Sequence, residues 1–455
     1  MIYNADPLAA LTRIGAVAVG GRVVRLGMGG PYLVSHPDHV RQVLRDSNAF
    51  VRRGMFWDQI RLLVGQHGVF AEGSWKHSRD LLQPHFTARA VSHVSERMHA
   101  VLARAIDQSI VPGQRIPLTT ALTRITYPVL SDLCGGWITE NDLQRLGPAY
   151  HAALRASTVR ILLSGVPDFV PLPGDRVVAR AVAMIDAVVY PRIRQARAHL
   201  ALADESTDTP PTDVLRLLCR AWRDEPPSTA EQAIRDDVVA LHGAVTESTV
   251  STLSWLWPIL HRHPGIVDHI TREVDELAGD GPLRAEHLPA LTYTQMTVRE
   301  ALRLYPSAWV IPRQVNQPVT VGGVTMPAGA TVLVSPFLMH RLPQVWERPH
   351  RFDPTRFAPG RAVPRGTYLP FGAGQHQCLG RHFFETTATL LLANTLRRYR
   401  PVIHGWARPQ LGPTNRPAPI TVTFAERRTG FKNRWPQHDS AHPGSNDGAA
   451  MSRAG

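Results

Sequence analysis

The sequence lacks several features that mark whole classes of protein. It has only three cysteines, Cys134, Cys219 and Cys378, and they lie far apart, so neither a disulfide framework nor a CxxC metal knuckle is expected. No segment reaches the roughly 18 uninterrupted apolar residues of a membrane helix. Arg13 interrupts the apolar N-terminal stretch, which argues against a signal sequence or an anchor. We therefore expect a cytoplasmic protein that does not span a membrane.

Lysine is almost absent, since Lys76 and Lys432 are its only occurrences. Arginine therefore carries nearly all of the 50 basic charges, which exceed 37 acidic ones to give a net charge of +13. Guanidinium groups suit carboxylates and phosphates, so an anionic partner is permitted. The sequence nevertheless has no long basic run and no recognisable nucleic-acid motif. We expect a dispersed basic surface and no nucleic-acid partner.

Helical periodicity dominates residues 38–305, and the regular strand–helix alternation of a doubly wound sheet is missing. In residues 315–335, short β-branched runs separated by glycine and proline predict hairpins. Residues 417–428 predict a terminal strand, whereas residues 341–380 have weak periodicity and predict a long functional loop. The expected fold class is mainly α with a small β portion.

The most informative segment is the cysteine loop, FGAGQHQCLG at residues 371–380, which directly precedes a helical pattern. A thiol at Cys378 would feel the helix N-terminus and nearby N–H groups, which favour a thiolate ligand. Phe371 offers an aromatic plane beside it. A free cysteine is more often a buried core residue, but in this composition the pattern FxxGxxxCxG should arise by chance with a frequency of roughly 0.0005.

These residues resemble the haem-binding loop of the cytochrome P450 family, whose cysteine is the axial iron ligand. The resemblance implies that Cys378 is the metal ligand of haem b, iron protoporphyrin IX, with Phe371 and Gly380 at the cofactor. His376 stands where the family has an Arg or His facing a propionate, although alone it would be taken for a surface histidine. The family's fold implies one P450-like domain over residues 1–428, followed by a polar, disordered tail at 429–455.

Glu300 and Arg303 are three residues apart on one face of a predicted helix. Alone they would indicate a solvated ion pair. Followed by WERPHRF at residues 346–352 and then by the cysteine loop, they resemble the family's Glu-Arg-Arg structural lock, which implies Glu300, Arg303 and Arg351. His350 departs from the family's more common Glu. The implied role is to hold the cysteine loop through bidentate pairs.

Three further residues match family positions that bind the haem propionates. Arg313 follows the predicted lock helix, and Trp75 and Arg79 lie in a segment that looks like the family's WxxxR helix. An enclosed porphyrin brings two carboxylates that need partners, and guanidinium and indole N–H groups are suitable donors. Each residue alone would indicate packing or surface charge. Together they imply the rim of one anionic cofactor.

Residues 228–231, STAE, predict a capping box that opens a long helix. This helix resembles the family's central helix with its Ala-Gly-x-Asp/Glu-Thr segment, here Ala244, Val245, Thr246, Glu247 and Ser248. The resemblance implies catalytic roles for Glu247 as a proton source and for Ser248 as a hydroxyl donor. A mid-helix Ser or Glu is otherwise solvated or back-bonded. Val245 in place of glycine would narrow the oxygen groove or displace a kink, with Gly243 as compensation.

The resemblance implies a monooxygenase that inserts one oxygen atom from O2 into a C–H or C=C bond of a hydrophobic small molecule, such as a terpenoid or another secondary metabolite. Its pocket would include Ala244, Val245, Val310 and Ile311. Because no flavin or nicotinamide domain is recognisable, electrons are expected from a ferredoxin or a similar donor. Val245 and Ser248 keep an O2-independent peroxide-driven or isomerase reaction open, and a non-catalytic haem-thiolate sensor is the other alternative.

Overall fold

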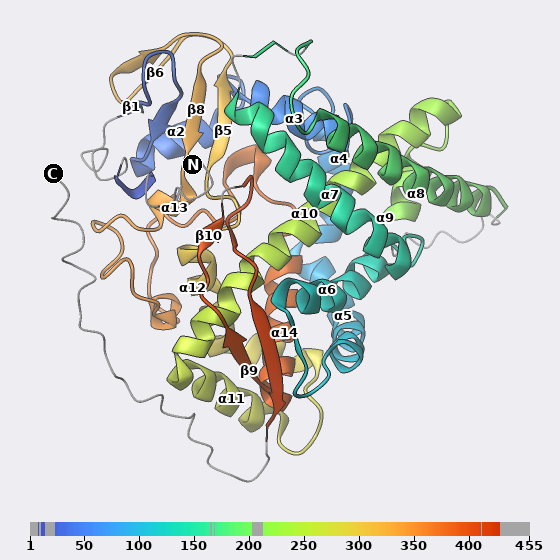
Figure 1. Ribbon diagram of the computed structural model, residues 1–455, viewed down its shortest axis with the longest axis vertical. Coiled ribbons are helices and arrows are strands. Elements are labelled where there is room, and N and C mark those ends of the chain that lie inside the picture. The colour runs from blue at the N-terminus through green and yellow to red at the C-terminus, as the bar shows by residue number, and fades with distance from the viewer. Residues whose placement is uncertain are drawn as a thin grey trace.

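The computed structural model describes residues 8, 11–13, 23–163, 166–167, 169–202, 213–410 and 412–427. The tail expected at residues 429–455 lies outside the described residues. In Figure 1 a small sheet occupies one corner of the molecule, the helices α5–α9 occupy the opposite side, and α10 crosses the middle. The expected fold class, mainly α with a small β portion, is confirmed.

Helices make up most of the described chain, and two of them are buried along nearly their whole length. These two, α10 (Pro227–Arg262) and α14 (Arg381–Arg398), form the centre of the fold. The others are α2 (Pro37–Arg45), α3 (Met55–Val64), α4 (Trp75–Leu82), α5 (Ala88–Ser109), α6 (Leu118–Leu133), α7 (Glu140–Leu162), α8 (Asp175–Leu202), α9 (Val214–Ala221), α11 (Pro264–Ala278), α12 (Thr292–Leu304) and α13 (Pro336–Met339). Short 3-10 turns are η2 (Gln83–Phe86), η3 (Ala285–Ala290), η4 (Pro354–Phe357) and η5 (Gly374–His376).

The strands form small, separate sheets. The largest sheet has the order β1-β2-β8-β5-β3 and contains β1 (Val24–Arg25), β2 (Tyr32–Val34), β3 (Phe50–Val51), β5 (Ile311–Val315) and β8 (Thr331–Val334). Another sheet joins β4 (Arg115–Pro117), β12 (Thr421–Glu426) and β9 (Tyr399–His404), and two hairpins pair β6 (Val319–Val321) with β7 (Val324–Met326) and β10 (Pro409–Gln410) with β11 (Arg416–Pro417). The predicted hairpins and terminal strand are confirmed.

The cysteine loop lies where two hydrophobic cores meet. The main core is formed chiefly by the helices, whereas a second core lies beneath the largest sheet. Phe371 and Leu379 pack against the main core, while Leu369 and Ala373 pack in the second. The loop is therefore supported from both sides.

The start of α10 differs from the expectation. The helix begins at Pro227 with no side-chain cap, so the capping box predicted for residues 228–231 is wrong. Proline at the first helical position already has the required φ and lacks an N–H that would need a cap. Glu231 instead pairs with Arg194 of α8 at 2.9 Å. Among the described helices, none has the length and apolar character needed to cross a bilayer.

Candidate functional site

A backbone hydrogen bond joins the two ends of the cysteine loop, and the loop packs closely against α2. The N–H of Cys378 donates to the Phe371 carbonyl oxygen at 2.9 Å, and Gly380 is the N-cap of α14. Gly374 has a φ of +73°, and a Cβ there would lie 2.1 Å from the Leu44 carbonyl oxygen of α2. Only glycine fits this approach, which gives the glycines of the predicted loop a structural reason.

Cys378 differs from the other two cysteines in accessibility. Its side chain is exposed, whereas Cys134 and Cys219 are buried. Burial raises the pKa of each buried thiol to about 12. The surroundings of Cys378 also raise its pKa by desolvation, but the Gly380 N–H and the Arg79 charge oppose this. An accessible thiol that is still desolvated by protein lies in a recess, and of the three it is the one suited to be a ligand.

Three arginines, Arg52, Arg79 and Arg313, lie beside the cysteine loop together with the ring of His376, and we call these four residues the cationic cluster. Arg52 and Arg313 are 5% and 4% exposed. Desolvation lowers the pKa of Arg52 to about 9 and that of Arg313 to about 10, so both remain charged at neutral pH. Arg52 also feels the positive charges of Arg313 and Arg79.

The cationic cluster is incompletely neutralised. Arg79 donates to the Gln377 carbonyl and to Gln83, each at 2.7 Å. Nε and Nη2 of Arg52 and both ring nitrogens of His376 are buried, and none of them has a hydrogen-bond partner within the part of the chain that the structure describes. The negative charge of Glu72 favours the charged forms of Arg52 and Arg313 and so raises their pKa values. Its Oε2 accepts the backbone N–H of Arg52 at 2.8 Å. Because buried charges need compensation, these donors are suited to anionic groups.

Aromatic rings support the cationic cluster. Trp75 and His376 have ring centroids 4.3 Å apart, and the Arg52 guanidinium lies 5.8 Å from the Trp75 ring and 5.5 Å from the Trp57 ring. Desolvation first, and then the charges of the neighbouring arginines, lower the pKa of His376 to about 3. The ring is therefore neutral and can donate from one nitrogen. Arg52 and Trp57 were missed by the sequence analysis.

The predicted Glu-Arg pair forms a lock with complete burial. Nε and Nη2 of Arg303 donate to the Glu300 carboxylate at 2.7 and 2.8 Å, and both side chains are 0% exposed. Nη1 of Arg303 donates to the carbonyl oxygens of His340 and Pro349, each at 2.7 Å. Every part of the guanidinium is thus used within the protein.

The third member of the lock is Arg356, so the prediction of Arg351 is wrong. Nε of Arg356 lies 3.3 Å from Glu300 Oε1, while the Arg351 side chain is exposed and only its carbonyl oxygen accepts from Arg303, at 3.1 Å. Asp353 accepts the Thr355 N–H at 3.0 Å and opens η4, which turns Arg356 inward. This Asx turn at Asp-Pro was the signal available in the sequence.

His340, also missed by the sequence analysis, links the lock to the cysteine loop. Its Nδ1 hydrogen-bonds the Arg303 carbonyl oxygen at 2.9 Å, and its Nε2 accepts the Leu369 N–H at 2.7 Å. Burial lowers the pKa of His340 to about 3, so the neutral ring has one donor and one acceptor. The lock therefore reaches the chain two residues before Phe371 through a single side chain.

The central helix α10 is unbroken through residues 244–248. Ala244 is exposed although residues 241–243 are buried, and Ser248, one turn later, donates to the Ala244 carbonyl oxygen. Val245 is half-buried and packs against the main core. Gly243 does not compensate for Val245, because a Cβ there would lie 1.9 Å from the Tyr150 ring of α7; this glycine makes room for Tyr150.

Glu247 faces a different space from Ala244. It borders a cavity of about 660 Å³ between α6, α7, α10 and β11, whose lining also includes Thr246. Its carboxylate accepts from Thr414 Oγ1 at 2.8 Å and pairs with Arg416 at 3.3 Å and His151 at 3.5 Å. Burial disfavours the charged form, but these partners hold the pKa of Glu247 below its ordinary value. The sequence analysis missed all three partners.

The residues expected to line the substrate pocket are apolar but lie in different surroundings. Val310 is half-buried and packs beside Leu33 and Phe337 in a third, small core. Ile311 is half-buried at the start of β5, and its Cδ1 would be 3.8 Å from a Cβ at Gly372, so it lies against the cysteine loop. Neither residue, nor Ala244 or Val245, lines the Glu247 cavity.

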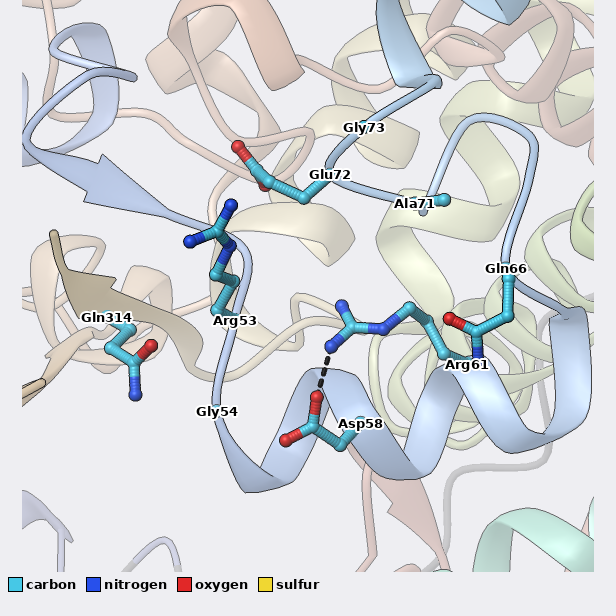
Figure 2. A pocket seen from close by; sticks show the side chains of 9 residues that line it. All are labelled: Arg53, Gly54, Asp58, Arg61, Gln66, Ala71, Glu72, Gly73 and Gln314. Atoms are coloured by element: carbon cyan, nitrogen blue, oxygen red, sulfur yellow. Dashed lines mark hydrogen bonds and ion pairs between the residues drawn. The ribbon is translucent and has the colours of Figure 1, made fainter.

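A second pocket, of about 430 Å³, is drawn in Figure 2. Its lining comes from Arg53 and Gly54 just before α3, from α3 itself, from β5, and from the loop that joins α3 to α4. Figure 2 shows Arg61 paired with Asp58 on α3, with Glu72 on the loop above them. Arg61 also donates to the Arg52 carbonyl oxygen at 3.1 Å. Glu72 thus borders this pocket and also accepts the backbone N–H of Arg52 in the cationic cluster.

Comparisons with known proteins agree on one family. The family described as cytochrome P450 matches residues 19–415. Cyclooctatin synthase of Streptomyces melanosporofaciens is 31% identical, over 87% of this chain and 84% of its own. Cyclooctat-9-en-7-ol 5-monooxygenase of the same organism is 32% identical, over 83% and 81%, and pentalenene oxygenase of Streptomyces avermitilis is 28% identical, over 84% of each. The crystal structure of the cytochrome P450DA heme domain superimposes with a TM-score of 0.77 at 23% identity, over 93% of each chain, which shows the same fold.

Proposed function

The chain belongs to the cytochrome P450 family of haem-thiolate monooxygenases, and we propose that it inserts one oxygen atom from O2 into a C–H or C=C bond of a terpenoid in secondary metabolism. The family activity requires a hydrophobic substrate, O2 and a redox partner. Support for the substrate class comes from the relatives, whose names refer to cyclooctatin, a cyclooctat-enol and pentalenene. The exposed Ala244 beside Val245, and the apolar Val310 and Ile311, suit such a ligand.

We propose haem b as the cofactor, held by Cys378 as the iron ligand with Phe371 and Gly380 beside it. The unpartnered nitrogens of Arg52 and His376, together with Arg313, are the donors that two propionates need. Arg79 and Trp75 complete this rim. When bound, the haem supplies the reductive activation of dioxygen, which a thiolate ligand favours.

Glu247 and Ser248 are proposed to move the protons of the reaction. Glu247 is ionised and borders the 660 Å³ cavity, so it can take up protons from that side. The Ser248 hydroxyl donates to the Ala244 carbonyl, which leaves its own lone pairs free to accept. Neighbouring side chains on a helix do not face each other, so a proton taken up at the Glu247 carboxylate would reach Ser248 Oγ through a bridging group such as a water molecule.

A ferredoxin or a similar protein is the proposed electron donor, and the cytoplasm is the proposed location. An accessible thiolate ligand suits a reducing compartment. The net charge of +13 favours an acidic donor protein. The comparisons do not favour the O2-independent and sensor alternatives, since the relatives are named as a monooxygenase and an oxygenase.

The observation that carries the proposal is the accessible Cys378 beside a buried cationic cluster with unfilled donors. The test is absorption spectroscopy of the reduced, CO-treated protein. We expect a thiolate-type Soret band in the wild type and in Cys134→Ser, a control at a buried cysteine, and its loss in Cys378→Ser. A thiolate-type band that survives in Cys378→Ser, or that is missing from the wild type, would show that the proposal is wrong.

The substrate class is tested separately by titrating the ferric protein with ligands. Cyclic terpene hydrocarbons and their monohydric alcohols should displace water and change the spin state, whereas polyols of similar size should not. A spin-state change with polyols alone would contradict the terpenoid assignment while leaving the haem assignment intact.

A further inference from the structure

Two adjacent carboxylates on α10 lie outside the machinery described above. Asp236 and Asp237 are each 1% exposed and lie two turns before Ala244. Each accepts a backbone N–H from the loop at residues 65–74, which joins α3 to α4. His67 N–H donates to Asp236 Oδ2 at 2.9 Å, and Val69 N–H donates to Asp237 Oδ1 at 3.0 Å. The loop is therefore attached to α10 at alternate residues.

Glycines bring the loop close enough to make these bonds. Gly65 and Gly68 both have positive φ, and a Cβ at Gly65 would lie 1.9 Å from Asp236 Oδ1. A Cβ at Gly68 would lie 2.7 Å from Asp237 Oδ1. Gly73, in the same loop, has nothing within 4 Å of its Cβ position. The two carboxylates thus occupy notches that only glycine leaves open.

The two carboxylates differ in their neutralisation. Asp236 pairs with Arg235 at 3.1 Å, and Arg235 also pairs with Asp186 of α8 at 2.8 Å. No cation pairs with Asp237 among the described residues, and its buried Oδ2 makes no hydrogen bond of good geometry. The hydroxyl of Ser78, on α4, is the side-chain donor whose hydrogen bond lowers the pKa of Asp237.

The attached loop leads directly to the residues assigned to the haem propionates. Val69 and Phe70 pack against the main core, and Phe70 lies beside Trp57, with ring centroids 6.3 Å apart. Glu72 accepts the Arg52 N–H, and the Trp75 N–H donates to the Ala71 carbonyl at 2.9 Å as α4 begins. Figure 2 shows this part of the loop, with Ala71, Glu72 and Gly73, above α3.

We propose that Asp236 and Asp237 are positioning residues that anchor the loop at residues 65–74 to α10 and thereby set the position of Arg52 and Trp75 toward the cofactor. The inference rests on the proposed function, because that function assigns Arg52 and Trp75 to the propionates. Neither carboxylate is among the residues assigned to the cofactor, and both act through the loop backbone.

The charge of Asp237 depends on pH, whereas its hydrogen bond to the Val69 N–H does not require that charge. Burial, with a further contribution from Asp236, raises the pKa of Asp237 to about 6, against the effect of Ser78 and the Val69 N–H. Arg235 and His67 lower the pKa of Asp236, and the charge of Asp236 in turn acts on Tyr190 of α8. A protonated Asp237 keeps Oδ1 as an acceptor and gains a donor at Oδ2 for Ser78.

The test measures backbone hydrogen exchange of the haem-loaded protein by mass spectrometry, together with the rate of haem loss to an excess of a haem-scavenging protein. Asp237→Ala removes the acceptor of the Val69 N–H, so exchange in residues 65–74 and haem loss should both accelerate about tenfold. Exchange in α12 should not change. Asp237→Asn retains an acceptor oxygen and should restore slow exchange. Gly73→Ala is the matched control in the same loop and should match the wild type.

If Asp237→Ala does not fold, Gly68→Ala replaces it, because its Cβ forces the loop away from Asp237. Loop exchange and haem loss in the disruptive variant equal to those of Gly73→Ala would overturn the inference. The CO-bound spectrum separates this outcome from failure of the proposed function. A wild type without a thiolate-type band refutes the proposed function, whereas a normal band with unchanged loop exchange refutes only the anchor.

Discussion

Two buried charge clusters flank the cysteine loop, and they are built in opposite ways. In the lock, the charges of Glu300, Arg303 and Arg356 compensate one another, and every guanidinium nitrogen of Arg303 donates to a protein oxygen. In the cationic cluster, Arg52 and His376 have buried nitrogens that find no hydrogen-bond partner among the residues that the structure describes. A cluster that is complete in itself serves stability, whereas a cluster left with unfilled donors is arranged for a ligand. The difference predicts opposite responses to mutation.

The largest effect is expected from breaking the lock. Arg303→Ala leaves the Glu300 carboxylate buried without its bidentate partner and should lower the free energy of unfolding by about 3–5 kcal/mol. Denaturant unfolding of the haem-free chain measures this directly. A loss below about 1 kcal/mol would mean that the lock, like the cationic cluster, is not a stability device.

Asp237, a buried carboxylate that pairs with no cation among the described residues, should make the stability of the protein depend on pH. The pKa of Asp237 in the folded protein, about 6, lies above its ordinary value, so the protonated form stabilises the fold. This contribution is complete below the ordinary pKa of 3.8 and is lost as the pH rises from there to about 6, up to about 3 kcal/mol in all. The wild type should therefore lose stability between about pH 4 and pH 6.5 relative to Asp237→Asn, as measured by melting temperature. Parallel curves for the two proteins would contradict this assignment.

The third arginine of the lock offers a matched pair of variants. Arg356→Ala removes an ion pair to the buried Glu300 and should cost about 1–3 kcal/mol of stability. Arg351→Ala removes an exposed side chain and should change stability by less than about 0.5 kcal/mol. Equal effects, measured in the same unfolding experiment, would argue against the register described here.

The smallest effect on the chain itself is expected at Arg52. Because this cation is buried and incompletely partnered, Arg52→Met should leave the haem-free protein no less stable than the wild type. The same variant should release haem about tenfold faster, since a charge-assisted hydrogen bond to a carboxylate is lost. A haem-free Arg52→Met that unfolds as readily as Arg303→Ala would remove the distinction between the two clusters.

Local sequence patterns were sufficient for part of the site. Glu300 and Arg303 were found because a helix places residues three apart on one face. Cys378 was found because its loop and the following helix are contiguous in the chain. Helix periodicity could not tell which arginine completes the lock, because the turn at Asp353 decides whether Arg351 or Arg356 faces Glu300.

Other residues had no local signal. Arg52 comes from the end of a short strand, and its neighbours Trp57, Arg313 and His376 come from separate elements. The partners of Glu247 are His151 on α7, Arg416 in β11, and Thr414 just before β11. Nothing in the sequence around Gly243 indicates that the Tyr150 ring packs against it.

The sequence alone determined the helical class, the family resemblance, the cysteine loop and the Glu300–Arg303 pair, because helix periodicity and short motifs operate over a few residues. Only the tertiary structure decided which cations remain unneutralised, which arginine completes the lock and which loop the two aspartates hold. Burial and long-range contact set the energy of a charge, and neither is written in the order of the residues.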